Sequence, residues 1–196
     1  ELLSQQLTVR LIKNKISKLK GNIIKSNGSL LEQLKSHLSF ELTDDQNQAI
    51  KEISKDQSSP NKMLRLIQGD VGSGKTIVAL HSMIQCAENS KKSILMAPTE
   101  ILAEQHYNTI KLFAEKLKLS CALITASNKK NHNYESDILI GTHALFQDKV
   151  SIDNIGLIVI DEQHRFGVHQ RILLNEKAGN ELSLIHISEP TRPLRI

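Results

Sequence analysis

The stretch Gly69-Asp70-Val71-Gly72-Ser73-Gly74-Lys75-Thr76 decides how the rest of the sequence is interpreted. It fits the pattern G-x-x-x-x-G-K-[ST], follows the apolar run 63–67, and opens a helical pattern that continues to about residue 88. Glycines permit positive φ angles and close backbone approach, so successive N–H groups can line an anion site at a helix N-terminus. This strand-loop-helix context disfavours a chance match. The stretch predicts a phosphate-binding loop in which Lys75 reaches the β- and γ-phosphates and Thr76 binds Mg²⁺.

Short apolar runs alternate with helical patterns on both sides of this loop. The runs are 63–67, 93–96, 121–124, 138–140 and 157–160. The helical patterns run from residue 44 to the polar loop at 56–61, from 75 to about 88, and from 100 to 117, with Thr43 as the expected N-cap of the first. Strands that alternate with helices in this way predict an α/β fold, with a parallel sheet buried on both faces and right-handed crossovers.

A second motif, Asp161-Glu162, follows the last of these apolar runs directly. An acid at the end of a buried strand is costly without a partner, and Mg²⁺ is the partner expected beside a phosphate loop. Asp161 would hold the water shell of the metal, and Glu162 would polarise an attacking water molecule. The alternative is a strand-end turn with two solvated acids. Ligands of open α/β sheets bind at the carboxyl ends of the strands, so we expect both motifs to meet at that edge.

Composition limits the class of protein. The chain has 196 residues, 39% of them hydrophobic, which is enough for one domain and an appendage. Aromatic residues make up 3%, so base stacking is not expected to dominate nucleic-acid binding. Cys86 and Cys121 stand apart in apolar runs, which favours buried structural thiols and a reducing, cytoplasmic location. No apolar run approaches the roughly 20 residues of a membrane-spanning helix, and no signal peptide is visible.

Positive charge is concentrated at the start of the chain. Residues 1–40 hold seven Lys or Arg and two acids, a balance of +5 in a chain whose net charge is +4. Helical spacing over 2–20 and a short helix over 30–38 suggest a linker that is too small to bury a core of its own. Its basic side chains could meet phosphates, or they could form an ordinary solvated helix face.

Four strings resemble superfamily 2 helicases and, within them, the RecG family of motors that remodel branched DNA. They are GDVGSGKT (69–76), MAPTEILAEQH (96–106), ILIGTHALFQ (138–147) and DEQHRFGVHQR (161–171), and LSFELTDDQ (38–46) resembles the family's stretch ahead of the adenine site. The resemblance implies a RecA-like P-loop NTPase lobe, an ATP-dependent DNA helicase that uses ATP and Mg²⁺, and a role in DNA repair and recombination. Its partner would be branched or forked DNA, with no membrane.

The resemblance also implies residue roles. Lys75, Asp161 and Glu162 would be catalytic, and the whole loop from Gly69 to Thr76 would bind ATP, with Gln46 reading the adenine and Phe40 packing against it. Two strand-end loops would grip a DNA backbone through small hydroxyl groups and helix N-termini: Pro98, Thr99, Glu100, Gly141, Thr142 and His143. Gln163, His164 and Arg165 would couple nucleotide state to a partner lobe. Thr99 and Thr142 could instead be helix caps, and His106 is expected to face the core.

The sequence also departs from the family. Ala126 replaces a usual glycine, which puts one DNA contact in doubt, and no wedge domain or second RecA-like lobe with an arginine finger is found. From Leu182 onward the chain resembles translated sequencing-adapter read-through, expected to be disordered or loosely packed. We therefore expect three parts: a helical linker at 1–40 after the missing wedge domain, an ATP-binding lobe at 41–181, and a non-native tail at 182–196.

Several alternatives stay open. One is a lobe of the related transcription-repair coupling translocase Mfd, and another is a nucleotide-binding module without turnover. An RNA helicase is disfavoured because the chain lacks Asp-Glu-Ala-Asp, and a small-molecule kinase because it lacks an Arg-rich lid. Fast hydrolysis needs the arginine finger, worth about 10³–10⁵ in rate, so we expect the chain alone to bind ATP-Mg weakly and to hydrolyse it very slowly.

Overall fold

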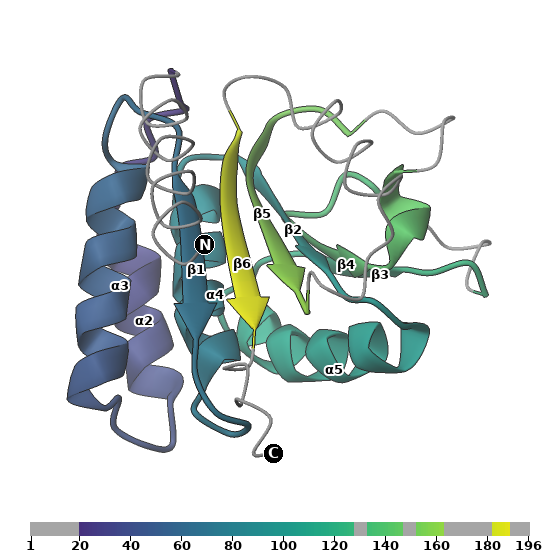
Figure 1. The fold of residues 1–196 in the computed structure, drawn as a ribbon, viewed down its shortest axis with the longest axis horizontal. Helices are drawn as coiled ribbons and strands as arrows, with labels where there is room; N and C mark the ends of the chain where they lie inside the picture. Colours follow the sequence, from purple (N-terminus) through teal and green to yellow (C-terminus); the bar gives the residue numbers. More distant parts are fainter. Residues whose placement is uncertain (1–19, 128–132, 147–151, 163–181, 189–196) are drawn as a thin grey trace, which may run out of the picture.

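Six parallel strands form one sheet in the computed structural model of the chain, which describes residues 20–127, 133–146, 152–162 and 182–188. The elements in chain order are α2 (Ser29–His37), α3 (Asp44–Gln57), β1 (Leu64–Gln68), α4 (Lys75–Glu88), β2 (Lys92–Met96), α5 (Glu100–Lys116), β3 (Cys121–Ile124), β4 (Ile138–Gly141), the 3₁₀ turn η2 (His143–Phe146), β5 (Ile155–Asp161) and β6 (Ser183–Ser188). The sheet order is β1-β6-β5-β2-β4-β3. The α/β fold predicted from the alternating pattern is confirmed (Figure 1).

Apolar side chains fill both faces of the sheet, as the continuous apolar runs predict. On one face the strands pack against α2 to α5, with Leu95, Val159 and Ile185 fully buried among helix residues. On the other face a smaller cluster gathers around Ile94 and Ile158. None of the helices within the described ranges is long and apolar enough to cross a membrane.

β6 corrects the prediction for the end of the chain. Residues Ser183–Ser188 form a strand between β1 and β5, parallel to both, so loose packing from Leu182 onward is wrong for this segment. Its apolar residues alternate between the two cores, with Leu184 in the smaller one and Ile185 and Ile187 against the helices. The prediction failed because it judged the tail by its likeness to read-through, whereas a short apolar run is itself a buried-strand signal.

The segment before the lobe is attached to α4. Ile24 and Leu34, in the predicted linker, are fully buried in the helical core. Glu88, near the end of α4, accepts hydrogen bonds from the backbone N–H groups of Leu30 at 2.8 Å and Asn27 at 3.1 Å, and from the Ser26 hydroxyl at 2.9 Å. The carboxylate therefore serves the first turn of α2, where acceptors and negative charge are favourable.

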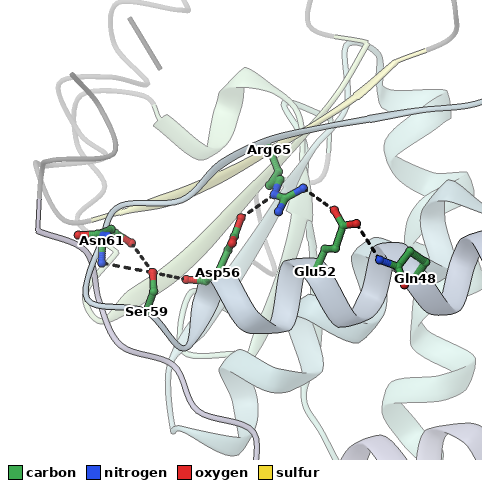
Figure 2. Close-up of polar contacts among 6 residues, drawn as sticks. All are labelled: Gln48, Glu52, Asp56, Ser59, Asn61 and Arg65. Atoms are coloured by element: carbon green, nitrogen blue, oxygen red, sulfur yellow. Dashed lines mark hydrogen bonds and ion pairs between the residues drawn. The ribbon is translucent and has the colours of Figure 1, made fainter. Parts of the chain in front are cut away.

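Arg65 attaches α3 to the edge strand β1. Its guanidinium donates to Asp56 at 2.6 Å and to Glu52 at 2.9 Å, and Gln48 donates to the same Glu52 carboxylate (Figure 2). These bonds lower the pKa of Glu52, first through Gln48 and then through Arg65. Each of these half-exposed ion pairs contributes little alone, but together they fix the helix beside the strand that leads to the glycine-rich loop.

The two cysteines are free thiols in the described structure. Cys86 is buried on α4, and burial raises its pKa to about 12. Cys121 opens β3 and is half-buried, and burial likewise raises its pKa to about 12. A thiol with so high a pKa carries almost no thiolate at neutral pH, which fits the predicted structural role.

Candidate nucleotide site

The glycine-rich loop connects the carboxyl end of β1 to the first turn of α4. Gly72 and Gly74 have φ angles of 79° and 78°, in the left-handed region that a side chain strains. The Lys75 ammonium donates to the carbonyl oxygens of Gly69 at 2.7 Å and Asp70 at 2.8 Å. An ammonium has three donors, so one is left after these two bonds. The loop thus holds the Lys75 ammonium against the carbonyl groups of its own first two residues.

The N-terminus of α4 differs from those of α3 and α5. Thr43 accepts from the Gln46 N–H to cap α3, and Thr99 accepts from the Leu102 N–H to cap α5. No side chain caps α4, whose N-cap is Gly74. Orphan N–H groups and the helix dipole therefore face the loop, as an anion site requires.

Gln46 lies against this loop. Its side-chain amide donates to the Ser73 carbonyl at 2.9 Å, and its Oε1 accepts from the Thr43 N–H at 3.0 Å in a capping box. The predicted reader of adenine is thereby placed at the glycine-rich loop, with both ends of its amide bonded. Phe40, the predicted base-packing residue, is 51% exposed just before α3. Both roles stay predictions.

Asp161 ends β5 at the same edge of the sheet as the loop. Ile67 on β1 and Asp161 on β5 both pair with Ile187 on β6, so the three residues form one row. Adjacent strands are about 4.8 Å apart, which puts the Asp161 backbone roughly 10 Å from the end of β1. Figure 1 shows the arrowheads of β1, β6 and β5 at one edge. The predicted convergence of the loop and the acidic pair on the carboxyl edge agrees with this geometry.

His106 bonds Asp161, which the sequence interpretation missed. Its Nε2 lies 2.8 Å from Oδ2 of Asp161, and the two side chains are 15% and 12% exposed. The residue was expected to face the core, and the α5 face that carries it does bury Ala103 and Ile110. A signal was available: a buried strand-end acid needs a partner, and α5 follows β2, the strand next to β5.

Glu162 has an unusual backbone. Its φ angle is 52°, a left-handed conformation that costs a non-glycine residue free energy, and its N–H donates to the Ile187 carbonyl at 2.9 Å. Strained residues of this kind cluster at functional sites, where the surrounding structure holds them in place. The strain therefore indicates that the position of Glu162 is constrained, which the sequence pattern did not predict.

The loops predicted to grip DNA follow β2 and β4. The Thr99 hydroxyl caps α5, and Thr142 is 3% exposed with its hydroxyl 3.5 Å from the Ala144 N–H. Both threonine oxygens therefore accept local hydrogen bonds, as the capping interpretation predicts, and contact of these loops with DNA stays a prediction. Pro98 is half-buried and His143 is exposed. A side chain at Gly141 would collide with the Ile124 carbonyl oxygen, so this glycine permits close approach of the neighbouring strand.

Glu100 joins two of these loops. Its carboxylate accepts from the Ser127 hydroxyl at 2.7 Å and from the Ser127 N–H at 3.2 Å. These hydrogen bonds lower the pKa of Glu100. The loop after β3, where Ala126 replaces the expected glycine, is thus tied to the start of α5. Gln163, His164 and Arg165, the predicted coupling residues, lie outside the described residues.

The donor set suits Mg²⁺ better than a metal held by protein alone. No cluster of three or more His, Cys, Asp or Glu side chains occurs within the described parts of the chain. Mg²⁺ usually keeps several waters and binds through one or two carboxylates together with substrate phosphates. Asp161, with Thr76 at the start of α4, fits that arrangement.

The sequence matches the DEAD/DEAH box helicase family over residues 43–188. It is 47% identical to the ATP-dependent DNA helicase RecG of Aquifex aeolicus over 189 residues, covering 90% of this chain and 24% of the relative. It is 47% identical to RecG of Staphylococcus aureus over 160 residues, covering 76% of this chain and 23% of the relative. The chain thus spans about a quarter of the length of these curated relatives.

Solved structures give the same likeness. RecG bound to a three-way DNA junction superposes with a TM-score of 0.78 at 35% identity, covering 93% of this chain and 26% of that one. A single-residue variant of S. cerevisiae Dbp5 bound to RNA and ADP BeF3 superposes with a TM-score of 0.66 at 19% identity, covering 84% of this chain and 44% of that one. The second likeness shows the fold alone.

Proposed function

Because the chain belongs to the DEAD/DEAH box helicase family, we propose that it forms the nucleotide-binding lobe of an ATP-dependent DNA helicase of the RecG type. One observation carries the proposal. The glycine-rich loop follows β1, Asp161 ends β5, and both strands pair with β6, so the loop and the acid lie at the same edge of the sheet. A nucleotide held on the N–H groups of α4 would then have a carboxylate within reach of its metal.

The residues present divide the work. The loop from Gly69 to Thr76 binds the phosphates, with Lys75 countering their charge and Thr76 ligating Mg²⁺. Mg²⁺ supplies charge neutralisation on the transferred phosphoryl group. Asp161 would help to hold the metal, and Glu162 would orient and polarise the attacking water molecule. Phe40 and Gln46 bind the base. The hydrogen bond from Gln46 to the Ser73 carbonyl links the base site to the glycine-rich loop.

Branched or forked DNA is the proposed partner, and DNA repair and recombination the proposed context. The relative bound to a three-way junction supports the substrate class. The loops around Thr99, Glu100 and His143 would contact the DNA backbone through backbone N–H groups and threonine hydroxyls, because each hydroxyl oxygen accepts a local hydrogen bond and its O–H can still donate to a phosphate. A second motor lobe and a wedge domain are the proposed partners within the whole protein, and a cytoplasmic location stays a prediction from the two free thiols.

Nucleotide-binding variants test the roles of the lysine and the second acid. Lys75→Ala should abolish binding of a fluorescent ADP in the presence of Mg²⁺, because the loop loses its cation. Glu162→Gln should bind as the parent chain does and should slow hydrolysis alone, because the acid acts on water rather than on the nucleotide. Equal loss of affinity in both variants would contradict these assignments.

The class of nucleic acid is tested on the full-length protein. Forked DNA should stimulate its ATPase activity, and single-stranded or duplex RNA of the same length should not. Stimulation by RNA alone would overturn the proposal in favour of an RNA helicase.

A further inference from the structure

We propose that His106 is a positioning residue that orients the Asp161 carboxylate toward the metal, an inference that rests on the proposed function. The two side chains meet at 2.8 Å, Nε2 to Oδ2. An ionised carboxylate only accepts hydrogen bonds, so Nε2 carries the hydrogen and His106 donates. Nothing in the family resemblance assigned a role to this histidine.

The bond leaves one oxygen of Asp161 for the metal. Within the described residues no second side chain bonds this carboxylate, and Asp161 is 12% exposed. The hydrogen bond from His106 to Oδ2 restricts rotation of the carboxylate, and Oδ1 stays available for the metal. Partners of this kind commonly set the orientation of metal-binding side chains, and their removal typically costs about 10–100-fold in metal affinity or activity.

The support behind His106 is rigid enough for this task. Ala103, His106 and Ile110 are spaced three and four residues apart on α5 and share one helix face. Ala103 and Ile110 are fully buried on either side of the histidine, and Thr99 caps the start of the helix. Packing of α5 therefore fixes the imidazole, and the imidazole in turn fixes the Asp161 carboxylate at the end of β5.

Mg²⁺ dependence of nucleotide binding measures the proposed role. The 196-residue chain is titrated with Mg²⁺ in the presence of fluorescent ADP, and the metal concentration at half-saturation is compared with the ADP affinity in EDTA. His106→Leu should raise the half-saturating Mg²⁺ concentration about 10–100-fold and leave the affinity in EDTA unchanged. His106→Gln, whose amide N–H reaches as far as Nε2, should restore most of the effect, whereas the shorter His106→Asn should not.

Matched variants separate this role from a purely structural one. Asn108→Leu changes an exposed position two residues along the same helix and should leave the Mg²⁺ requirement as in the parent chain. A normal Mg²⁺ requirement in a folded His106→Leu or His106→Asn variant would overturn the inference. So would a His106→Gln variant that is as impaired as His106→Asn.

The same titration distinguishes failure of the inference from failure of the proposed function. If ADP binding by the parent chain does not respond to Mg²⁺, and Asp161→Asn changes nothing, the proposed metal site itself is wrong. If the parent chain responds to Mg²⁺ and Asp161→Asn abolishes the response, but His106→Asn behaves as the parent, only the positioning role is wrong.

Discussion

Gly74 is restricted both by its backbone conformation and by a side-chain contact. Its φ angle of 78° costs an alanine about 1–2 kcal/mol, and a Cβ there would also collide with the side-chain amide of Gln46. Gly28 supplies the matched control, because its φ angle is 80° and a Cβ would meet nothing within 4 Å. Both glycines are N-caps, of α4 and α2.

We therefore expect Gly74→Ala to lower the free energy of unfolding by about 1 kcal/mol more than Gly28→Ala, the cost of displacing the Gln46 hydrogen bonds. Urea unfolding of the two variants measures the difference. Only Gly74→Ala should also weaken binding of fluorescent ADP, because it alone distorts the glycine-rich loop. Equal destabilisation by the two substitutions would mean that Gln46 does not pack against this loop.

At the residue scale, motifs with a fixed local geometry were predictable and side-chain partners were not. The pattern from Gly69 to Thr76 specifies a turn and a helix start by itself, and both occur where expected. The bond between His106 and Asp161 joins residues 55 positions apart, so it depends on which strands are neighbours. Thr142, whose predicted contact with DNA stays a prediction, also accepts a local hydrogen bond from the Ala144 N–H.

At the element scale, α2 depends on a residue of another helix. Three donors at the start of α2, the backbone N–H groups of Asn27 and Leu30 and the Ser26 hydroxyl, share the Glu88 carboxylate. Glu88→Ala should weaken attachment of residues 20–38 to α4 by about 1–2 kcal/mol, while α4 itself keeps a strong helix former. Amide hydrogen exchange at Asn27 and Leu30 should then accelerate about 5–30-fold.

Glu88→Gln provides the graded control for this attachment. It keeps one acceptor oxygen and loses the charge, so its exchange rates should fall between those of the parent chain and Glu88→Ala. Unchanged exchange in Glu88→Ala would show that burial of Ile24 and Leu34 alone holds the segment in place.

Element positions followed from apolar periodicity with one exception. β1 to β5 lie within a few residues of the predicted runs. For the central strands β2, β4 and β5 the reason is burial on both faces, which reads as continuous apolar sequence. β6 has the same pattern, and the prediction excluded it only because the surrounding tail resembled read-through. The order of the strands was beyond the sequence argument, since crossovers of similar length allow several neighbours for β1.

At the scale of the whole molecule, β6 connects the two halves of the candidate site. It pairs with β1, which leads to the glycine-rich loop, and with β5, which ends at Asp161. Ile185 in its middle is fully buried, so Ile185→Ala should lower the free energy of unfolding by about 2–5 kcal/mol. The spacing between the loop and the acid depends on this strand, so binding of fluorescent ADP with Mg²⁺ should weaken as well.

Leu66 gives the matched comparison for Ile185. It lies on β1, pairs with His186 of β6 and is 57% exposed, so Leu66→Ala removes a similar side chain from the same part of the sheet without opening a cavity. Its effect on urea unfolding should stay within about 0.5 kcal/mol. If Ile185→Ala proves as mild as Leu66→Ala, β6 does not bridge β1 and β5 in solution. The glycine-rich loop and the acid would then lose the strand that sets their distance.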